Sequence, residues 1–87
     1  MYYVYIIANE EGKTYIGFTG DLENRLKKHN STENKGFTKN SKWHYVYYEA
    51  YLSKEDAVLR EQRLKSHGQS KRQLKERIQN SINQGNN

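Results

Sequence analysis

The sequence contains no cysteine, and this absence excludes several kinds of chemistry at once. Disulfide bonds, thiolate zinc sites and cysteine nucleophiles are all ruled out. Long apolar runs are missing too, because the longest, Met1 to Ala8, is too short for a membrane span. We therefore expect a protein of the reducing cytoplasmic compartment, with no membrane partner and no disulfide partner.

Apolar residues are also scarce, at 33% of the chain, and the mean hydropathy is −1.21. Such a composition leans towards disorder. The apolar residues nevertheless fall in periodic clusters. Eight tyrosines add further apolar surface, because a tyrosine ring can be buried while its hydroxyl group remains in contact with water. The chain has 87 residues and no internal repeat or break in composition, so we predict a single domain over residues 1–83 and a frayed tail over 84–87.

Positive charge is in excess, since the chain has fifteen lysines and arginines but only ten acidic residues, which gives a net charge of +5. A basic balance in a small domain predicts a polyanionic partner, most often nucleic acid. The alternative is that the positive charge serves solubility alone. Charge by itself does not decide between these two interpretations.

The first eighteen residues predict a β-hairpin. Residues 2–8 and 13–18 are rich in aromatic and β-branched side chains, which favour strands. If residues 10–12 form a three-residue loop with a left-handed glycine, Tyr5 and Tyr15 lie on the same face of the sheet. A loop of two or four residues would place them on opposite faces. We predict the three-residue loop.

The rest of the pattern predicts elements in the order helix, strand, helix, helix. Asp21 and Ser53 are placed to cap the first two of these helices. The last helix presents Leu74, Ile78 and Ile82 at four-residue spacing, which is typical of one apolar face. The expected elements cover residues 21–30, 43–51, the residues from Ser53 to about Ser66, and a stretch that starts near Ser70.

One acidic residue interrupts an apolar helix face. Glu61 lies four residues after Ala57 and three before Leu64, where a carboxylate is costly unless it is paired or bound to a metal. A single carboxylate that faces a phosphate suits a hard cation such as Mg²⁺, which completes its coordination with water and substrate oxygens. The alternative is an ordinary exposed ion pair between Glu61 and Lys65, one helical turn away.

Two basic residues border the apolar stripe of the first helix. The planar guanidinium of Arg25 is suited to phosphate oxygens and to the charge that develops during phosphoryl transfer. His29 lies one turn further along. The alternatives are that the stem of Arg25 merely covers Leu22 and that His29 interacts with the helix dipole.

Tyr5 and Tyr15 are candidates for chemistry, although aromatic residues on strands are usually packing residues. A phenol serves as a general base only where neighbouring positive charge or metal-bound water makes its proton easier to remove. Two phenols on one sheet face, close to a guanidinium and a metal-binding carboxylate, would meet that requirement.

Taken in order, these residues resemble the GIY-YIG nuclease family. The similarity is greatest to its small stand-alone members, which are related to the nuclease domain of the DNA-repair protein UvrC. The residues that carry it are Tyr3-Val4-Tyr5, Tyr15-Ile16-Gly17, Arg25, His29 and Glu61. The resemblance extends over nearly the whole chain. It implies an α+β fold (an α/β sandwich) in which a three-stranded antiparallel sheet is flanked by about three helices.

The resemblance also implies an activity, that of a metal-dependent endonuclease that hydrolyses phosphodiester bonds in DNA with one Mg²⁺ or Mn²⁺ ion. Glu61 corresponds to the sole metal-binding carboxylate and Arg25 to the phosphate-contacting arginine. Tyr5 and Tyr15 correspond to the motif tyrosines, one of which takes a proton from the attacking water, and His29 matches a histidine of many members. The alternatives are a nucleic-acid-binding module that cleaves poorly or not at all, and a protein-interaction domain.

Other residues are expected to support binding and catalysis. Contacts to the DNA backbone are predicted for Lys35, Lys39, Lys42, Lys71, Arg72 and Lys75. Phe37 and Trp43 would stack on unpaired bases if the DNA is branched or has single-stranded regions. Lys13, together with His29, would help to tune the catalytic base.

Overall fold

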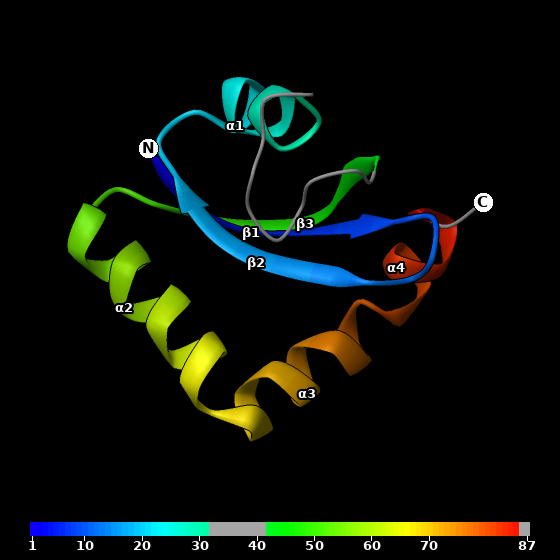
Figure 1. Ribbon diagram of the computed structural model, residues 1–87. Coiled ribbons are helices and arrows are strands. Elements are labelled where there is room, and N and C mark those ends of the chain that lie inside the picture. The colour runs from blue at the N-terminus through cyan, green and yellow to red at the C-terminus, as the bar shows by residue number, and fades with distance from the viewer. Residues whose placement is uncertain (32–41, 86–87) are drawn as a thin grey trace.

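Three antiparallel strands form the middle of the molecule (Figure 1). In this computed structural model, which describes residues 1–31 and 42–85, the strands are β1 (Tyr2–Asn9), β2 (Thr14–Thr19) and β3 (Trp43–Tyr51). Their order in the sheet is β2-β1-β3, so β1 is central and β2 forms one edge. The predicted three-stranded antiparallel sheet is therefore confirmed.

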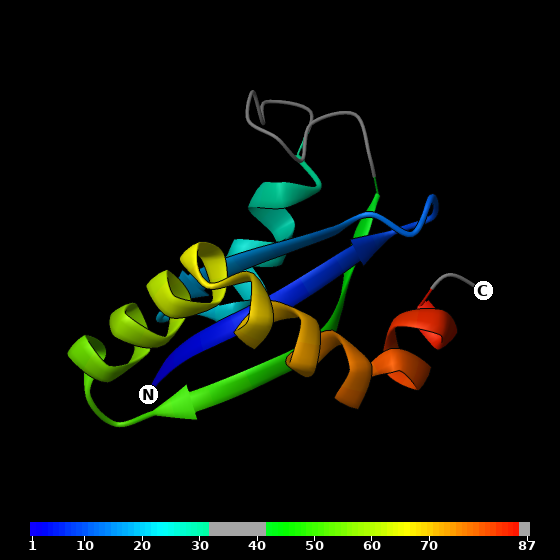
Figure 2. The same cartoon turned by 90° about the horizontal axis from the view of Figure 1, so that it is seen from below.

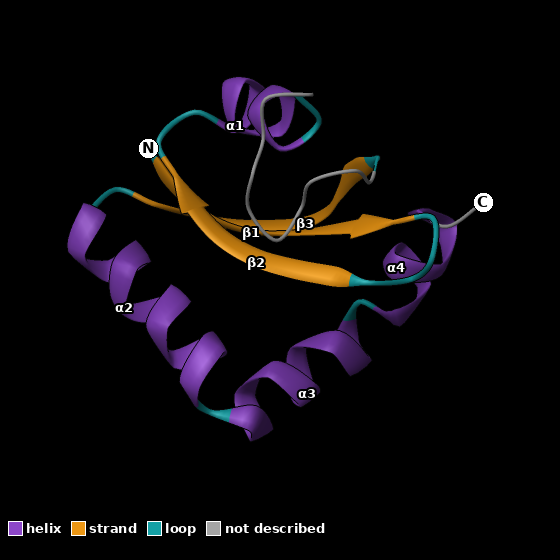
Figure 3. Cartoon of the chain, in the orientation of Figure 1, coloured by secondary structure: helices purple, strands orange, loops and turns teal. Residues whose placement is uncertain are grey.

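Helices cover both faces of this sheet (Figure 3). One face carries α1 (Leu22–His29), and the other carries α2 (Lys54–Ser66), α3 (Gly68–Arg77) and α4 (Gln79–Gly85), which Figure 2 shows running across the strands. Asp21 caps α1 by accepting a hydrogen bond from the backbone of Asn24 at 3.1 Å, and Ser53 caps α2, as predicted. None of the helices within residues 1–31 and 42–85 is both long and apolar enough to cross a membrane.

The hairpin between β1 and β2 has the predicted three-residue loop. Gly12 adopts a positive φ of 81°, and the side-chain oxygen of Asn9 accepts hydrogen bonds from the backbone of Glu11 and Lys13, each at 3.0 Å. The register pairs Ile7 with Tyr15. Odd positions therefore oppose odd positions, and Tyr5 and Tyr15 lie on the same face.

Each face of the sheet has its own apolar cluster. On the α2–α3 face the buried residues are Val4, Ile6, Ile16, Ala57, Leu64 and Leu74. On the α1 face Tyr5, Ile7 and Trp43 are buried, and Leu22 and Leu26 pack against them. Because alternate residues of β1 point to opposite faces, this one strand supplies the centre of both clusters.

The expectation that Trp43 stacks on DNA bases is wrong. Its side chain is only 3% exposed and belongs to the cluster beneath α1. The side chain of Asn30, at the end of α1, holds the Trp43 backbone with two hydrogen bonds of 2.7 and 2.9 Å. The ring is thus used to dock α1 against β3, and no aromatic face is left for a base. Phe37 lies outside the described residues.

The last predicted helix is two helices. The chain starts α3 at Gly68, two residues earlier than expected, and leaves helical geometry at Ile78, where φ is −111° and ψ is 21°. Ile78 packs against the cluster of the α2–α3 face, and α4 then contacts β3 and β1. The bend keeps the chain against the sheet. Residues Gln84 and Gly85 of the expected tail belong to α4.

Candidate active site

Tyr5 lies at the centre of the candidate site, on the central strand beneath α1. Its side chain is 0% exposed, and its ring lies across Gly17, its partner on β2. A Cβ atom at position 17 would overlap with the end of the ring and would lie 2.9 Å from Cε2. The glycine of the Tyr-Ile-Gly motif therefore provides the space that the first tyrosine occupies.

The side chains of α1 engage the hydroxyl group of Tyr5. Burial raises the pKa of Tyr5, while the charge and the hydrogen bond of Arg25 act in the opposite direction. The Tyr5 oxygen also lies 2.7 Å from Nε2 of His29. Since a guanidinium only donates, the Tyr5 oxygen is the acceptor in its hydrogen bond with Arg25.

Burial and nearby charge also set the protonation state of His29. Burial lowers the pKa of His29, and the charges of Arg25 and Lys28 lower it further. The His29 ring is therefore neutral near pH 7. The structure thus brings Tyr5, Arg25 and His29, three of the predicted site residues, into one hydrogen-bonded group.

Tyr15 lies beside this group on the edge strand β2 and is partly exposed. Its ring centroid is 5.3 Å from that of His29, and the Nζ atom of Lys65 lies 5.3 Å from the ring centroid on another side. A groove of about 310 Å³ runs past Tyr15 and is lined by Thr14, Tyr15, Ile16, Lys65 and Lys71. Tyr15 is consequently the more accessible of the two phenols.

Glu61 is held near Tyr15 by α2, which packs on the opposite face of the sheet. The Glu61 carboxylate forms an ion pair with Lys65 at 3.4 Å, as the alternative interpretation of Glu61 predicted. The pair is not freely exposed, however, because the Glu61 side chain is only 21% accessible. Lys65 joins Glu61 to Tyr15 around the edge of β2; in the described part of the chain Glu61 pairs with Lys65 rather than with Arg25.

The donor set at Glu61 fits a hard divalent ion. The described residues contain no group of three or more histidine, cysteine, aspartate or glutamate side chains that would enclose a metal. Mg²⁺ does not need such a cage, because it usually keeps several waters and binds one or two carboxylates together with substrate phosphates. The partly buried Glu61 carboxylate, whose ion-pair partner Lys65 lines the groove, provides a ligand of that kind.

Tyr45, a residue that the sequence did not single out, completes the wall around Tyr5. Its hydroxyl group donates to the backbone oxygen of Leu22, and its ring meets that of Tyr5 edge to face at 5.4 Å. Burial raises the pKa of Tyr45 to about 12. Simple alternation along β3 would put Tyr45 with Tyr47 on the other face, but a bulge opposite Ile6 and Ile7 turns it towards α1.

A second unpredicted group fixes α2 to β3. The Glu49 carboxylate accepts hydrogen bonds from Nε and Nη2 of Arg60, at 2.9 to 3.2 Å, and also from the hydroxyl groups of Tyr47 and Tyr51. Burial acts to raise the pKa of Glu49, but these hydrogen bonds outweigh it and hold the pKa below its ordinary value. The alternating Tyr47-x-Glu49-x-Tyr51 pattern was the available signal. Arg60 directly precedes Glu61.

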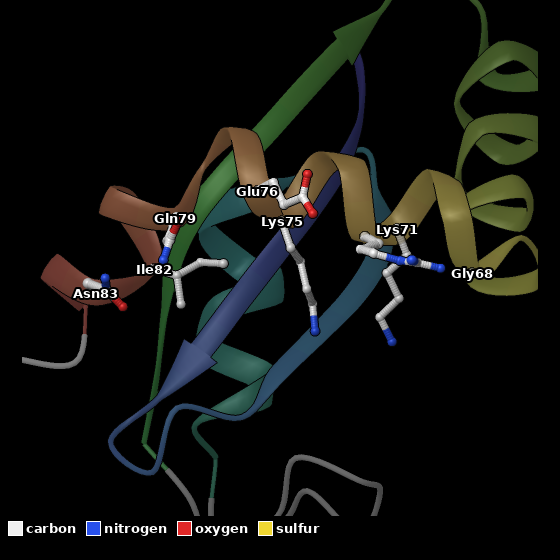
Figure 4. Close-up of a pocket in the computed structure, with 8 residues that line it drawn as sticks. Gly68, Lys71, Lys75, Glu76, Gln79, Ile82 and Asn83 are labelled. Carbon is white, nitrogen blue, oxygen red and sulfur yellow. The ribbon is translucent and has the colours of Figure 1, made fainter.

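The predicted DNA-contact residues fall into two groups. Lys71, Arg72 and Lys75 lie on α3 and line a groove of about 480 Å³ that continues along α4. Figure 4 shows the side chains of Lys71 and Lys75 extending from the same side of α3. Lys71 lines the groove beside Tyr15 as well, so the two grooves share a cation. Lys42 is exposed just before β3, whereas Lys35 and Lys39 lie outside the described residues.

Lys13, expected to help tune the base, pairs instead with Glu11 at 3.5 Å on the exposed hairpin. The positive charge next to Tyr15 is that of Lys65.

Comparison with known proteins agrees with this geometry. A family profile described as the GIY-YIG catalytic domain matches residues 1–75. The chain is 35% identical over 79 residues to UPF0213 proteins from Staphylococcus aureus strains Mu3, Mu50 and N315. These alignments cover 87% of this chain and 96% of each relative. No solved structure matches the chain.

Proposed function

Because the chain belongs to the GIY-YIG catalytic-domain family, we propose that it is a metal-dependent endonuclease that hydrolyses phosphodiester bonds in DNA. One observation carries this proposal. The hydrogen-bonded group of Tyr5, Arg25 and His29 adjoins Tyr15, and Lys65 links Tyr15 to the half-buried Glu61. Packing alone would not require a guanidinium, an imidazole and a carboxylate to gather around two phenols at the edge of one sheet.

The two tyrosines have different roles in this proposal. Tyr5 is buried, burial raises its pKa, and its hydroxyl group is engaged with Arg25 and His29. These properties suit a residue that orients its neighbours. Tyr15 is partly exposed and faces the groove, so we assign it the removal of a proton from the attacking water.

The charged residues act on the phosphate. Arg25 is half-buried against the tyrosines and supplies a fixed positive charge for the phosphate oxygens. Glu61 would hold one Mg²⁺ or Mn²⁺ ion, whose contribution in such sites is to neutralise charge on the phosphate and the leaving oxygen. His29 keeps the Tyr5 hydroxyl group in its orientation through the 2.7 Å hydrogen bond.

DNA would follow the two grooves that share Lys71. Lys71, Arg72 and Lys75 line the larger groove and would contact phosphates there, and such contacts carry no sequence information. Lys35, Lys39 and Lys42 remain predicted contacts. Branched and single-stranded DNA remain predicted substrates, without the contribution first expected from Trp43.

The test is cleavage of supercoiled plasmid and of branched DNA in Mg²⁺ by wild type, Glu61→Ala and Arg25→Ala. We expect wild type to nick at least one substrate and both variants to lose at least about a hundredfold in rate, the scale of losing one main transition-state contact. Lys27→Ala is the matched control, because Lys27 is an exposed cation on the same helix as Arg25.

The outcomes are distinct. If wild type and both variants nick DNA at the same rate, the nuclease assignment is wrong. If none of them nicks DNA but all bind it, the chain is a nucleic-acid-binding module with the same fold. If none of them binds DNA at low salt, a protein-interaction domain becomes the better interpretation.

A further inference from the structure

Lys65 contacts both Glu61 and Tyr15, and the roles proposed so far give it no part in catalysis or DNA binding. Its Nζ atom lies 3.4 Å from the Glu61 carboxylate and 5.3 Å from the centroid of the Tyr15 ring. It also lines the groove beside Tyr15 together with Lys71. No other described cation contacts both Glu61 and Tyr15.

A comparison within the molecule separates Lys65 from an ordinary helix pair. Lys27 and Glu23 on α1 form an ion pair of the same i,i+4 spacing at 3.6 Å, with side chains 72% and 82% exposed. For Lys65 and Glu61 the exposed fractions are 46% and 21%. The Glu61 carboxylate has therefore lost much of its water and depends more strongly on the cation beside it.

We propose that Lys65 is the displaceable counter-ion of Glu61 and, once displaced, a ligand for a DNA phosphate in the groove beside Tyr15. The inference rests on the proposed function, since it assumes that Glu61 binds a divalent ion. An ammonium group and a divalent ion repel one another and compete for one carboxylate. Lysine is a compact charge on a flexible stem, so Nζ moves into the groove without any change in the backbone.

This arrangement couples two binding events through one side chain. Without a divalent ion, Lys65 is occupied by Glu61 and contributes little to DNA binding. With the ion bound, Lys65 is free to contact a phosphate. By thermodynamic linkage, DNA must then strengthen ion binding by the same factor by which the ion strengthens DNA binding.

The first experiment measures Mn²⁺ affinity without DNA, by electron paramagnetic resonance or calorimetry. Lys65→Met should bind Mn²⁺ about fivefold more tightly than wild type, because the ion no longer has to displace the Lys65–Glu61 ion pair, and fivefold is the scale of the attraction between two unit charges about 4 Å apart in water. Lys27→Met, which removes the corresponding cation of the matched pair, should bind like wild type. Equal Mn²⁺ affinities for wild type and Lys65→Met would overturn the displacement.

The second experiment measures DNA binding to a short labelled duplex, with gels to verify that the duplex stays intact. Without divalent ions, wild type and Lys65→Met should bind alike. With saturating Mn²⁺, wild type should bind about threefold or more tightly than Lys65→Met, and its logarithmic salt dependence should be steeper by about one unit. A difference of the same size with and without Mn²⁺ would contradict the proposal.

Glu61→Gln provides a test that needs no metal. This variant releases Lys65 permanently, so adding Lys65→Met to it should weaken DNA binding about threefold even without divalent ions. If the double variant binds DNA as tightly as Glu61→Gln alone, Lys65 is not a phosphate ligand. These readouts are separate from cleavage: an active nuclease with these negative results keeps the proposed function and loses only the role of Lys65.

Discussion

Tyr5 and Gly17 act as one unit, although they belong to different motifs. The motif glycine has no positive φ to explain it, since among the glycines that the structure describes Gly12 alone has that conformation. What position 17 requires is empty space, because the Tyr5 ring fills the volume that a side chain would take. The ring must lie there for its hydroxyl group to reach His29 and Arg25.

We predict that Gly17→Ala destabilises the protein and disrupts the site together. The added Cβ overlaps with a ring that is packed on all sides, and overpacking of this kind costs about 1–3 kcal/mol. Urea unfolding measures the loss in free energy, and plasmid nicking measures the loss in rate.

Gly20→Ala is the matched control, because its Cβ would meet only Tyr2 atoms at 3.9 Å, an ordinary contact distance. If Gly17→Ala and Gly20→Ala have the same midpoint in urea, the packing explanation of the motif glycine is wrong.

At the scale of elements, the orientation of α2 decides where Glu61 lies. The Glu49 carboxylate on β3 binds Arg60 in a bidentate manner and also receives two tyrosine hydroxyl groups. Since Arg60 and Glu61 are adjacent on a helix, fixing Arg60 towards β3 limits how far Glu61 can rotate away from β2. This contact therefore links the α2–β3 packing to the candidate site.

We predict that Glu49→Gln lowers the free energy of unfolding by about 2 kcal/mol at pH 7, less than for a fully buried pair because both side chains keep some solvent contact. The folded-state pKa of Glu49 lies below the ordinary value of 4.5. Its contribution is therefore fully present above about pH 4.5 and is lost as pH falls through the lower folded value.

Chemical unfolding of wild type and Glu49→Gln between pH 7 and pH 3 checks this, and the difference between them should shrink towards acid. Arg63→Ala, an exposed change on the same helix, should leave stability nearly unchanged. A difference between wild type and Glu49→Gln that stays constant down to pH 3 would contradict the assignment.

The same elements show what sequence could predict. Gly12 and the alternation of β1 and β2 were enough for the loop length and for the shared face of Tyr5 and Tyr15. These are local effects of turn geometry and side-chain period. The bulge that turns Tyr45 towards α1 and the break at Ile78 depend on packing between distant segments. The sequence pattern also could not predict which cation lies next to Tyr15, because Lys65 reaches the Tyr15 ring only through the packing of α2 against β2.

At the scale of the whole molecule, the candidate site lies where the two helical layers meet at one edge of the sheet. Arg25 and His29 come from α1 on one face, and Glu61 and Lys65 come from α2 on the other. Tyr15 on the edge strand lies between them. At this edge the groove beside Tyr15 shares Lys71 with the larger groove along α3. Part of the excess positive charge of the chain is therefore concentrated along one path.

We therefore predict that Lys71→Ala combined with Lys75→Ala weakens DNA binding uniformly across sequences and lowers the logarithmic salt dependence by about two units, one for each lost phosphate contact. The matched control is Lys27→Ala combined with Lys54→Ala, which removes the same charge from exposed positions on α1 and α2. Both double variants have a net charge of +3, that is, +5 less two lysines. A general attraction between a basic protein and DNA would weaken equally in the two variants. A track along α3 requires a larger loss for Lys71 and Lys75, measured by fluorescence anisotropy from about 50 to 200 mM salt, where such contacts change affinity most visibly.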